Sequence, residues 1–301
     1  MAEMNASTLI ATQKSFKALF LQSFDGVVAS WPKHAMEIQS SNAAEIHQWL
    51  GRVAAMREWI DSKAAAGLTG FDFTVKNKDW ESTIEVDRNN IEDDQLGLYT
   101  PRIRDLGERA KQHPDSLLSL RRREGVTVLG YDGQFFYDTD HAEGASGTQS
   151  NKLTGTGTTA TKVRDDLFAA KAQLRKFKDD KGEPFILNMG NLDVIAVIPP
   201  DLEKVFDELN NPAPGSTTPK TPIVYEVDPR LIDVTDWYLD YVGAPIKPYI
   251  HQVRKAFSFV ALDDPNSAES VFMRKKLYYG VEGRYNMSYA LHQFSILTTN
   301  T

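Results

Sequence analysis

The chain has 301 residues, 41% hydrophobic and 25% charged, an ordinary composition for a globular protein with a core of its own. It contains no cysteine, which excludes disulfides, thiolate metal sites and cysteine nucleophiles. A formal net charge of −7 argues against a protein whose main task is to grip nucleic acid.

The N-terminal segment lacks the basic start and apolar stretch of a secretory signal, and no run approaches the roughly 20 apolar residues of a membrane helix.

Apolar residues at helical spacing predict a helix over residues 8–24, among them Phe16 and Phe20. Trp31-Pro32 should interrupt it. A second helix is predicted over residues 43–63, with apolar anchors at Trp49, Leu50, Met56, Trp59 and Ile60.

The period then changes to that of strands. Phe71, Phe73 and Val75 alternate with polar residues, and so do Ile84 and Val86. Residues 76–79 between them read as a polar turn, so the sequence predicts a β-hairpin. An isolated hairpin is marginally stable, and this one needs a surface to lie on, in its own chain or in another.

A strong helix signal covers residues 100–123. Thr100 can cap the helix and Pro101 suits its first turn. Pro114 lies inside the apolar pattern and predicts a kink or a restart near His113. The basic run at residues 121–123 is interpreted as a solvated helix end near the negative pole of the dipole.

The second half alternates loops with shorter elements. Two short strands are predicted around Asp132-Gly133, and residues 141–161 are rich in Gly, Ser and Thr, which predicts a mobile loop and a domain boundary. Helices are predicted over 163–178 and from Pro199 to Leu209, with an apolar strand at 192–198 between them. Residues 223–301 are mostly strand-like.

Chemical motifs are weak. One acidic cluster within ten residues could bind a divalent metal: Asp132, Asp138, Asp140 and His141. Asp residues at this density more often stabilise turns, because their side chains hydrogen-bond the nearby backbone. The run GTGTT at 155–159 lacks the Gly-Lys-Ser/Thr ending of a phosphate-binding loop. Neither a His-Glu-x-x-His pair nor a Gly-x-Ser-x-Gly turn occurs. We therefore expect no catalytic residue, no cofactor and no metal, and predict that the protein is not an enzyme.

The predicted hairpin carries the candidate contact residues instead. Glu81, Glu85 and Asp87 would form the polar face of its second strand and suit a basic surface on a neighbouring chain. Lys76 and Lys78 could donate a covalent crosslink only beside an Asn and a buried carboxylate, which the sequence does not show. The full set of predicted inter-subunit residues is Phe16, Phe20, Phe73, Lys76, Lys78, Trp80, Glu81, Glu85 and Asp87.

Several segments together resemble the Mu-like prophage major head subunit family. They are WLGRVAAMREWID (49–61), the stretch from ESTIEVDRNN to SLLSL (81–120), YDGQFFYDTDH (131–141) and FMRKKLYYGVEGRYNMSYALHQ (272–293). The last departs from the family, whose ending often carries Gly and a Trp-Gln pair, because this chain has Tyr289-Ala290 and His292-Gln293.

The resemblance implies an α+β phage capsid fold of the Hong Kong 97 type. Residues 1–64 would be the N-terminal arm and its helical base, and 65–95 the extended hairpin loop. Residues 96–157 and 241–301 would form the peripheral domain with its long spine helix, and 158–240 the axial domain.

The resemblance also implies a major capsid protein that self-assembles into an icosahedral shell around the phage genome. Its partners would be copies of itself in pentamers and hexamers, scaffold and portal proteins, decoration proteins, and packaged DNA touched only non-specifically, with no membrane. It would be assembled in the host bacterial cytoplasm and reside in the virion capsid. The alternatives are a soluble enzyme with a dispersed active site and a phage decoration or binding protein.

The arm and the hairpin should bury their apolar faces on sister copies. Removal of residues 1–24, or a charge in place of Trp80, is accordingly expected to leave a folded subunit that assembles poorly.

Overall fold

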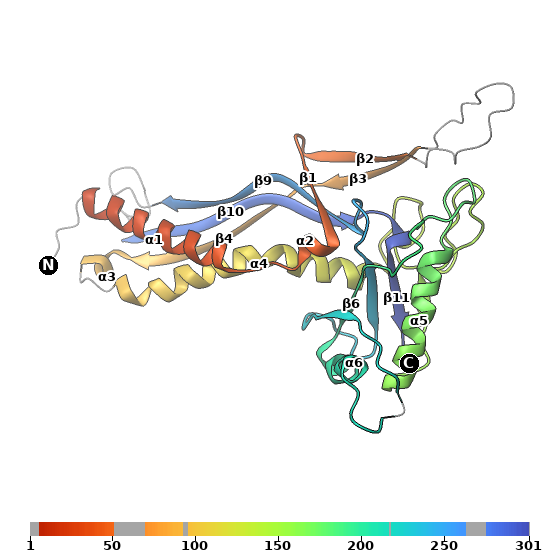
Figure 1. The fold of residues 1–301 in the computed structure, drawn as a ribbon. Coiled ribbons are helices and arrows are strands. Elements are labelled where there is room, and N and C mark those ends of the chain that lie inside the picture. Colours follow the sequence, from red (N-terminus) through yellow and green to blue (C-terminus); the bar gives the residue numbers. More distant parts are fainter. Residues whose placement is uncertain (1–5, 51–69, 93–95, 217, 263–274, 301) are drawn as a thin grey trace.

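The computed structural model describes residues 6–50, 70–92, 96–216, 218–262 and 275–300. The chain forms two lobes at an angle to one another, with a β-hairpin projecting beyond both (Figure 1). In the described residues no helix is long and apolar enough to cross a bilayer.

The long lobe is a four-stranded sheet covered by two long helices. The sheet order is β1-β9-β10-β4, with β1 (Ala35–Gln39) parallel to β9 (Tyr249–Leu262) and the other neighbours antiparallel. β10 (Lys276–Tyr289) lies at its centre and β4 (Lys78–Asp87) at one edge. The helices are α1 (Ala6–Gly26) and α4 (Thr100–Glu124), and short helices α2 (Trp31–His34), α3 (Arg88–Glu92) and η1 (Leu96–Leu98) connect the elements.

Helix α4 confirms the predicted spine-like helix. Its buried positions Ile103, Leu106, Ala110, Leu117 and Leu118 repeat at helical spacing and face the core. Of the kink or restart predicted near His113, the restart is wrong, because the helix runs through Pro114 as one element. Because Pro114 has no amide hydrogen, the helix lacks one backbone hydrogen bond at this position. The buried residues on both sides of Pro114 hold the helix in place.

The two long helices cross at a glycine. A Cβ on Gly107 of α4 would lie 2.6 Å from the carbonyl oxygen of Phe20 and 3.1 Å from the amide nitrogen of Phe24, both in α1. Phe16 and Phe20 of α1 are each 2% exposed and pack in the core with residues of α4 and β10. Helix α1 is therefore an integral layer of its own subunit.

The short lobe is a five-stranded sheet with two helices. The order is β5 (Lys152–Thr154), β11 (Ser295–Thr299), β8 (Trp237–Tyr241), β6 (Val194–Ile198) and β7 (Val224–Val227). Its core includes residues of α5 (Ala160–Lys176) and α6 (Glu203–Asn210), the latter preceded by η2 (Pro200–Leu202). The predicted helices at 163–178 and 199–209 and the strand at 192–198 are confirmed within a few residues. After β10, η3 (His292–Phe294) leads into β11.

Two predictions on the hairpin region are wrong. Residues 44–50 are not helical but form β2 (Ala44–Leu50), which pairs with β3 (Gly70–Lys76) over seven residue pairs. The rest of the predicted 43–63 helix lies outside the described residues. Strands β3 and β4 do not form a hairpin with each other, because β4 finds a ten-pair ladder with β10 and buries Val86 in the long-lobe core. The projecting hairpin is β2–β3.

Two further segments differ from the expectation. Around Asp132-Gly133 the structure has one isolated bridge, Leu129 with Phe135, in place of two strands. The Gly, Ser and Thr-rich segment 141–161 holds β5 and several buried, hydrogen-bonded polar side chains, which are His141, Glu143, Ser146, Gln149 and Asn151. Composition alone predicts a loop, whereas buried polar contacts fix much of this one.

Candidate inter-subunit surfaces

The β2–β3 hairpin extends away from both lobes (Figure 1). Polar hydrogen bonds hold its base. Gln252 of β9 donates from Nε2 to the carbonyl oxygen of Val75 (3.0 Å) and to Oδ1 of Asn77 (2.9 Å). Its Oε1 lies 2.8 Å from Nε2 of His47, and Asn77 donates to Oγ of Ser40 at 2.8 Å. The base of the hairpin is thus fixed to the long-lobe sheet.

The described side chains of the hairpin leave apolar surface uncovered. Ile46 of β2 is 62% exposed. Phe73, a predicted contact residue, is half-buried against the short-lobe core, and Lys76 is exposed. Backbone and side-chain hydrogen bonds from Ser41, Asn42 and Ser40 lower the pKa of Glu45 to about 2. The turn before β2 therefore keeps the carboxylate of Glu45 ionised.

Edge strand β4 carries the predicted charged residues. Lys78 and Glu81 are exposed. Glu85 and Asp87 lie 2.9 Å and 3.3 Å from Nζ of Lys276 on β10. Lys276 holds the pKa of Glu85 below its usual value, and for Asp87 the largest cause of a lowered pKa is the backbone hydrogen bond from Asn89. These two carboxylates therefore already have a basic partner within the subunit.

Trp80 also finds its partners in its own chain. Its ring lies 4.5 Å from that of His113 on α4, and its Nε1 donates to the carbonyl oxygen of Tyr285 at 2.9 Å. A charge in place of Trp80 would disturb the contact between α4 and the sheet, so it would affect the fold of the subunit as well as its assembly. The same holds for removal of residues 1–24, which would take Phe16 and Phe20 out of the core.

An ionic network joins the two lobes. Asp240 of β8 is fully buried and accepts hydrogen bonds from Nη2 of Arg122 (2.8 Å), Nδ1 of His34 (2.7 Å) and Oγ of Ser295 (2.6 Å). Burial alone would raise the pKa of Asp240, but Arg122 and these hydrogen bonds outweigh it and lower the pKa to about 2. Arg122 is 3% exposed, so the expectation of a fully solvated basic helix end is wrong for this residue.

The other side of the network involves Glu226 on β7. Its Oε2 lies 3.2 Å from Nε2 of His34, and it also accepts hydrogen bonds from Lys33 and Ser30. Burial opposes ionisation, but His34, Lys33 and Ser30 together lower the pKa of Glu226 to about 2. The imidazole of His34 therefore bridges one carboxylate of β7 and one of β8.

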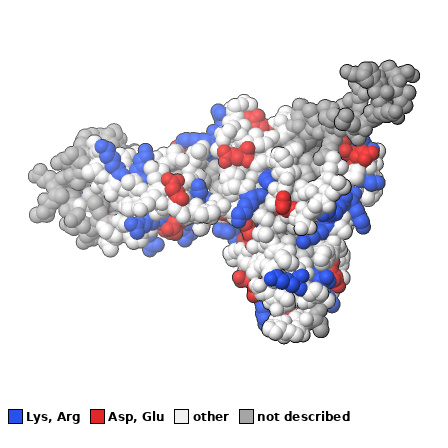
Figure 2. Space-filling view, viewed as in Figure 1, with Lys and Arg blue, Asp and Glu red and all other residues white. Residues whose placement is uncertain are grey.

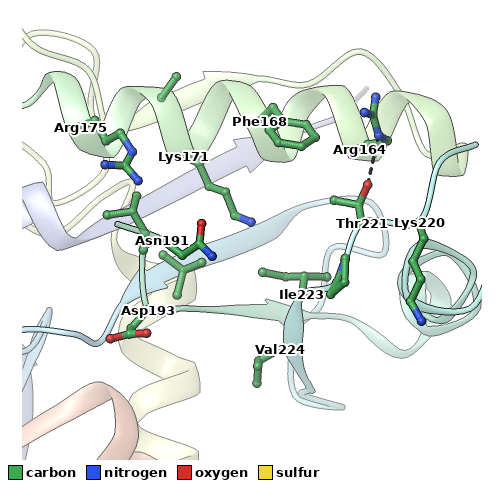
Figure 3. Close-up of a pocket in the computed structure, with 14 residues that line it drawn as sticks. Arg164, Phe168, Lys171, Arg175, Asn191, Asp193, Lys220, Thr221, Ile223 and Val224 are labelled. Atoms are coloured by element: carbon green, nitrogen blue, oxygen red, sulfur yellow. Dashed lines mark hydrogen bonds between the residues drawn. The ribbon is translucent and has the colours of Figure 1, made fainter. Parts of the chain in front are cut away.

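A basic groove of about 700 Å³ opens along α5 (Figure 3). Arg164, Lys171 and Arg175 of α5 lie on one side of the groove. The other side includes the carboxylate Asp193, just before β6, and Lys220, in the segment before β7. Arg164 donates to Oγ1 of Thr221 (3.1 Å), and burial lowers the pKa of Lys171. Four cations against one carboxylate suit an acidic partner.

On the face shown in Figure 2, basic and acidic side chains alternate over both lobes. Neither sign forms a continuous field there. That pattern offers little to a protein that must grip the phosphate backbone of DNA.

A buried histidine cluster lies apart from these surfaces. Ligand atoms of Asp132, His141 and His292 lie within 4.8 Å of one another, and the two imidazoles stack with centroids 3.7 Å apart. Asp132 and His141 belong to the acidic run noted in the sequence, whereas Asp138 and Asp140 are not in the group. His292 is 151 positions beyond His141, and no spacing signal in the sequence links the two.

The sequence comparisons agree on one family. Residues 9–163 and 228–301 match the family model described as Mu-like prophage major head subunit gpT. The chain is 26% identical over 286 residues to the Mu-like prophage FluMu major head subunit of Haemophilus influenzae, covering 93% of this chain and 71% of that protein. It is 32% identical over 140 residues to the major capsid protein of Escherichia phage Mu, covering 44% and 46%.

Solved capsid structures share the fold. The chain is similar to the procapsid protein of bacteriophage JBD30, with a TM-score of 0.61 and 24% identity over 99% of this chain and 77% of that one. A virus-like particle from Pyrococcus furiosus gives a TM-score of 0.57 at 10% identity, covering 95% and 98%. The predicted α+β capsid fold is confirmed.

Proposed function

The chain belongs to the Mu-like prophage major head subunit family, gpT, and from that membership we propose how its copies contact one another in the phage head. It is a major capsid protein, the subunit that forms the shell. We propose that copies self-assemble as pentamers and hexamers into an icosahedral virion capsid that encloses the genome, and that they do so in the host cytoplasm. The protein would act as a building unit and not as an enzyme, with scaffold, portal and decoration proteins as partners and non-specific contacts to DNA.

The lobes suggest the domain roles. The long lobe with α4 as spine helix would be the peripheral domain, and the short lobe the axial domain. The projecting β2–β3 hairpin, rather than residues 65–95, would be the extended loop.

The observation that carries the contact model is the exposed hairpin. A two-stranded ribbon that leaves Ile46 largely in solvent gains stability by covering that side chain on a neighbour. Full burial of an Ile contributes roughly 1.5–3 kcal/mol, and every copy in a closed shell repeats the contact. Phe73, Lys76, Lys78 and Glu81 would lie in or beside the same interface. Glu85, Asp87 and Trp80, which already have partners in their own subunit, would contribute at its margin.

The basic groove on α5 would form a second contact. Three acidic residues at and before α6 are exposed on the same lobe, Asp201, Glu203 and Asp207, against one exposed cation among them, Lys204, and we refer to the three as the acidic ridge. Two different, complementary patches on one subunit make a head-to-tail contact, which closes into a ring when the rotation between copies divides a full turn and otherwise gives an open filament. The ridge of one copy would therefore seat on the groove of the next.

The hairpin contact is tested with Ile46→Asp, with Ile46→Val as the matched control that keeps an apolar side chain. We expect Ile46→Asp subunits to retain the wild-type circular dichroism spectrum and melting temperature, while the yield of shells falls about tenfold or more, as expected for a lost contact of at least about 1.4 kcal/mol. Ile46→Val should assemble normally. Sedimentation and electron microscopy measure the yield, and normal shells from Ile46→Asp would refute the contact.

A further inference from the structure

An uncharged loop with exposed apolar side chains lies at one end of the basic groove. Its residues, 187–190, lie between α5 and β6, and the next residue, Asn191, lines the groove. Leu187 and Met189 are both exposed, Met189 to 98%. Residues 184–192 contain no charged side chain. Two large apolar groups in one uncharged loop exceed the single exposed apolar residues that any protein surface carries.

Hydrogen bonds hold this loop in one shape. Arg175 of α5 donates from Nη1 to the carbonyl oxygen of Asn188 (2.8 Å) and from Nη2 to that of Gly190 (2.5 Å). The side chain of Asn188 accepts from the amide of Gly190 (2.8 Å) and donates to the carbonyl oxygen of Asn191 (3.3 Å). Figure 3 shows Arg175 and Asn191 at the same end of the groove. We call residues 187–190 the pinned loop. It has little backbone freedom left to lose when a partner covers it.

A hollow of about 460 Å³ lies elsewhere on the short lobe. Its buried lining includes the core residues Leu231, Tyr238 and Leu297, and Ile232, which also lines it, is 75% exposed. The charged side chains of the lining balance one another, two cations and two carboxylates: Arg123, Lys152, Asp233 and Asp236. We call this site the sheet-end hollow. It carries no net charge, and neither does the pinned loop.

The strand pairing puts the pinned loop and the sheet-end hollow at opposite ends of the short-lobe sheet. Strands β6 and β7 are parallel, so both begin at the end where the pinned loop and the basic groove lie. At the end where they finish, β8 begins and β11 ends, and the hollow is lined from there by residues of 231–236, Tyr238 and Thr299. The acidic ridge also starts there, since Asp201 follows β6 by three residues. The five residues of β6 span about 16 Å, so the pinned loop does not reach the hollow of its own subunit.

We propose that the pinned loop of one copy inserts Leu187 and Met189 into the sheet-end hollow of the next copy. The inference rests on the proposed capsid contacts and extends them. The groove-to-ridge contact runs in the same direction, from the start of β6 and β7 in one copy to their end in the next. Opposite charges attract the groove and the ridge, and uncharged apolar surfaces meet at the loop and the hollow. One head-to-tail placement therefore makes both contacts.

The first test exchanges apolar for charged side chains in the full-length chain. Met189→Glu and Ile232→Lys should each lower the yield of shells about tenfold or more, as expected for the loss of an apolar contact. Both should keep the wild-type circular dichroism spectrum and melting temperature, because both side chains are exposed in the free subunit. The chain that carries both substitutions should assemble better than either single variant, since opposite charges then meet between copies. Val28→Glu, at an apolar residue that is 92% exposed between α1 and α2, is the matched control and should assemble normally.

The second test uses the absence of cysteine from the chain. Shells of the chain with both Met189→Cys and Ile232→Cys are treated with a short bismaleimide and separated by denaturing gel electrophoresis. We expect a ladder that extends to pentamers and hexamers, because a head-to-tail contact links every copy to two others. Each single-cysteine chain has one reactive side chain per copy and should stop at dimers.

Three results would overturn the inference. Met189→Glu could assemble like Val28→Glu, the double charge substitution could assemble no better than the poorer single variant, or the two-cysteine chain could yield nothing larger than a dimer. Each of these results means that the pinned loop does not enter the hollow of a neighbouring copy, while wild-type shells would leave the capsid function standing. A wild-type chain that forms no shells would instead refute the proposed function, and this inference with it.

Discussion

Replacement of Asp240 by Asn tests the ionic network between the lobes. Asn keeps the shape of the side chain but removes the charge, so Arg122, 3% exposed, would lose its carboxylate partner at 2.8 Å. His34, which is fully buried, would lose one of its two carboxylates. Breaking a buried pair by removing one partner costs about 3–5 kcal/mol, because the other charge remains buried without compensation.

The assay is urea unfolding of unassembled subunits, followed by circular dichroism and tryptophan fluorescence. The matched control is Asp105→Asn on the exposed face of α4, where Asp105 pairs with Arg109 at 2.9 Å. That exposed i,i+4 pair contributes only about 0.3–0.5 kcal/mol. If Asp240→Asn unfolds at the same urea concentration as Asp105→Asn, the network does not hold the lobes together and the reasoning fails.

Three other outcomes follow from the same structure. Because the folded-state pKa values of Asp240 and Glu226 are about 2, below the ordinary values of 3.8 and 4.5, their contribution to stability is complete above about pH 5 and is lost as the pH falls toward 2. Acid titration of Asp240→Asn should therefore show a shallower loss of stability than the wild type. Phe20→Ala should lower the free energy of unfolding by about 3–5 kcal/mol, and a value below 1 kcal/mol would show that α1 is a detachable arm after all. Gly107→Ala should cost about 1–3 kcal/mol by pushing α1 off α4, whereas Gly26→Ala, with open space around its Cβ, should be nearly neutral in thermal melts.

The sequence predicted the elements whose pattern is long and local. Helix α4 repeats its apolar positions over 25 residues, and β6 is an unbroken apolar run. Strand β2 was missed because the apolar residues of 44–50 fit both the helical and the strand period, and the partner strand β3 begins 20 residues further on. The pairing of β4 could not be predicted from its neighbours in sequence, since its partner β10 begins 189 positions after Asp87.

The surfaces were harder to predict than the elements. Phe16 and Phe20 form an apolar stripe with no local partner, and only the fold shows that β10 and α4 cover them. Arg122 sits among three arginines that look alike in sequence, yet it alone reaches the buried Asp240. The histidine cluster shows the same limit, because residue spacing carries information within an element and almost none between elements.

The passage from β10 to β11 has a mechanical consequence. Residues 290–294 join the central strand of the long sheet directly to the short sheet, and all five side chains are buried. Outward pressure in a filled capsid puts each subunit under tension. Tension applied to one lobe would travel along the covalent backbone into the other, and pulling them apart would first require extracting Leu291 and Phe294 from the core.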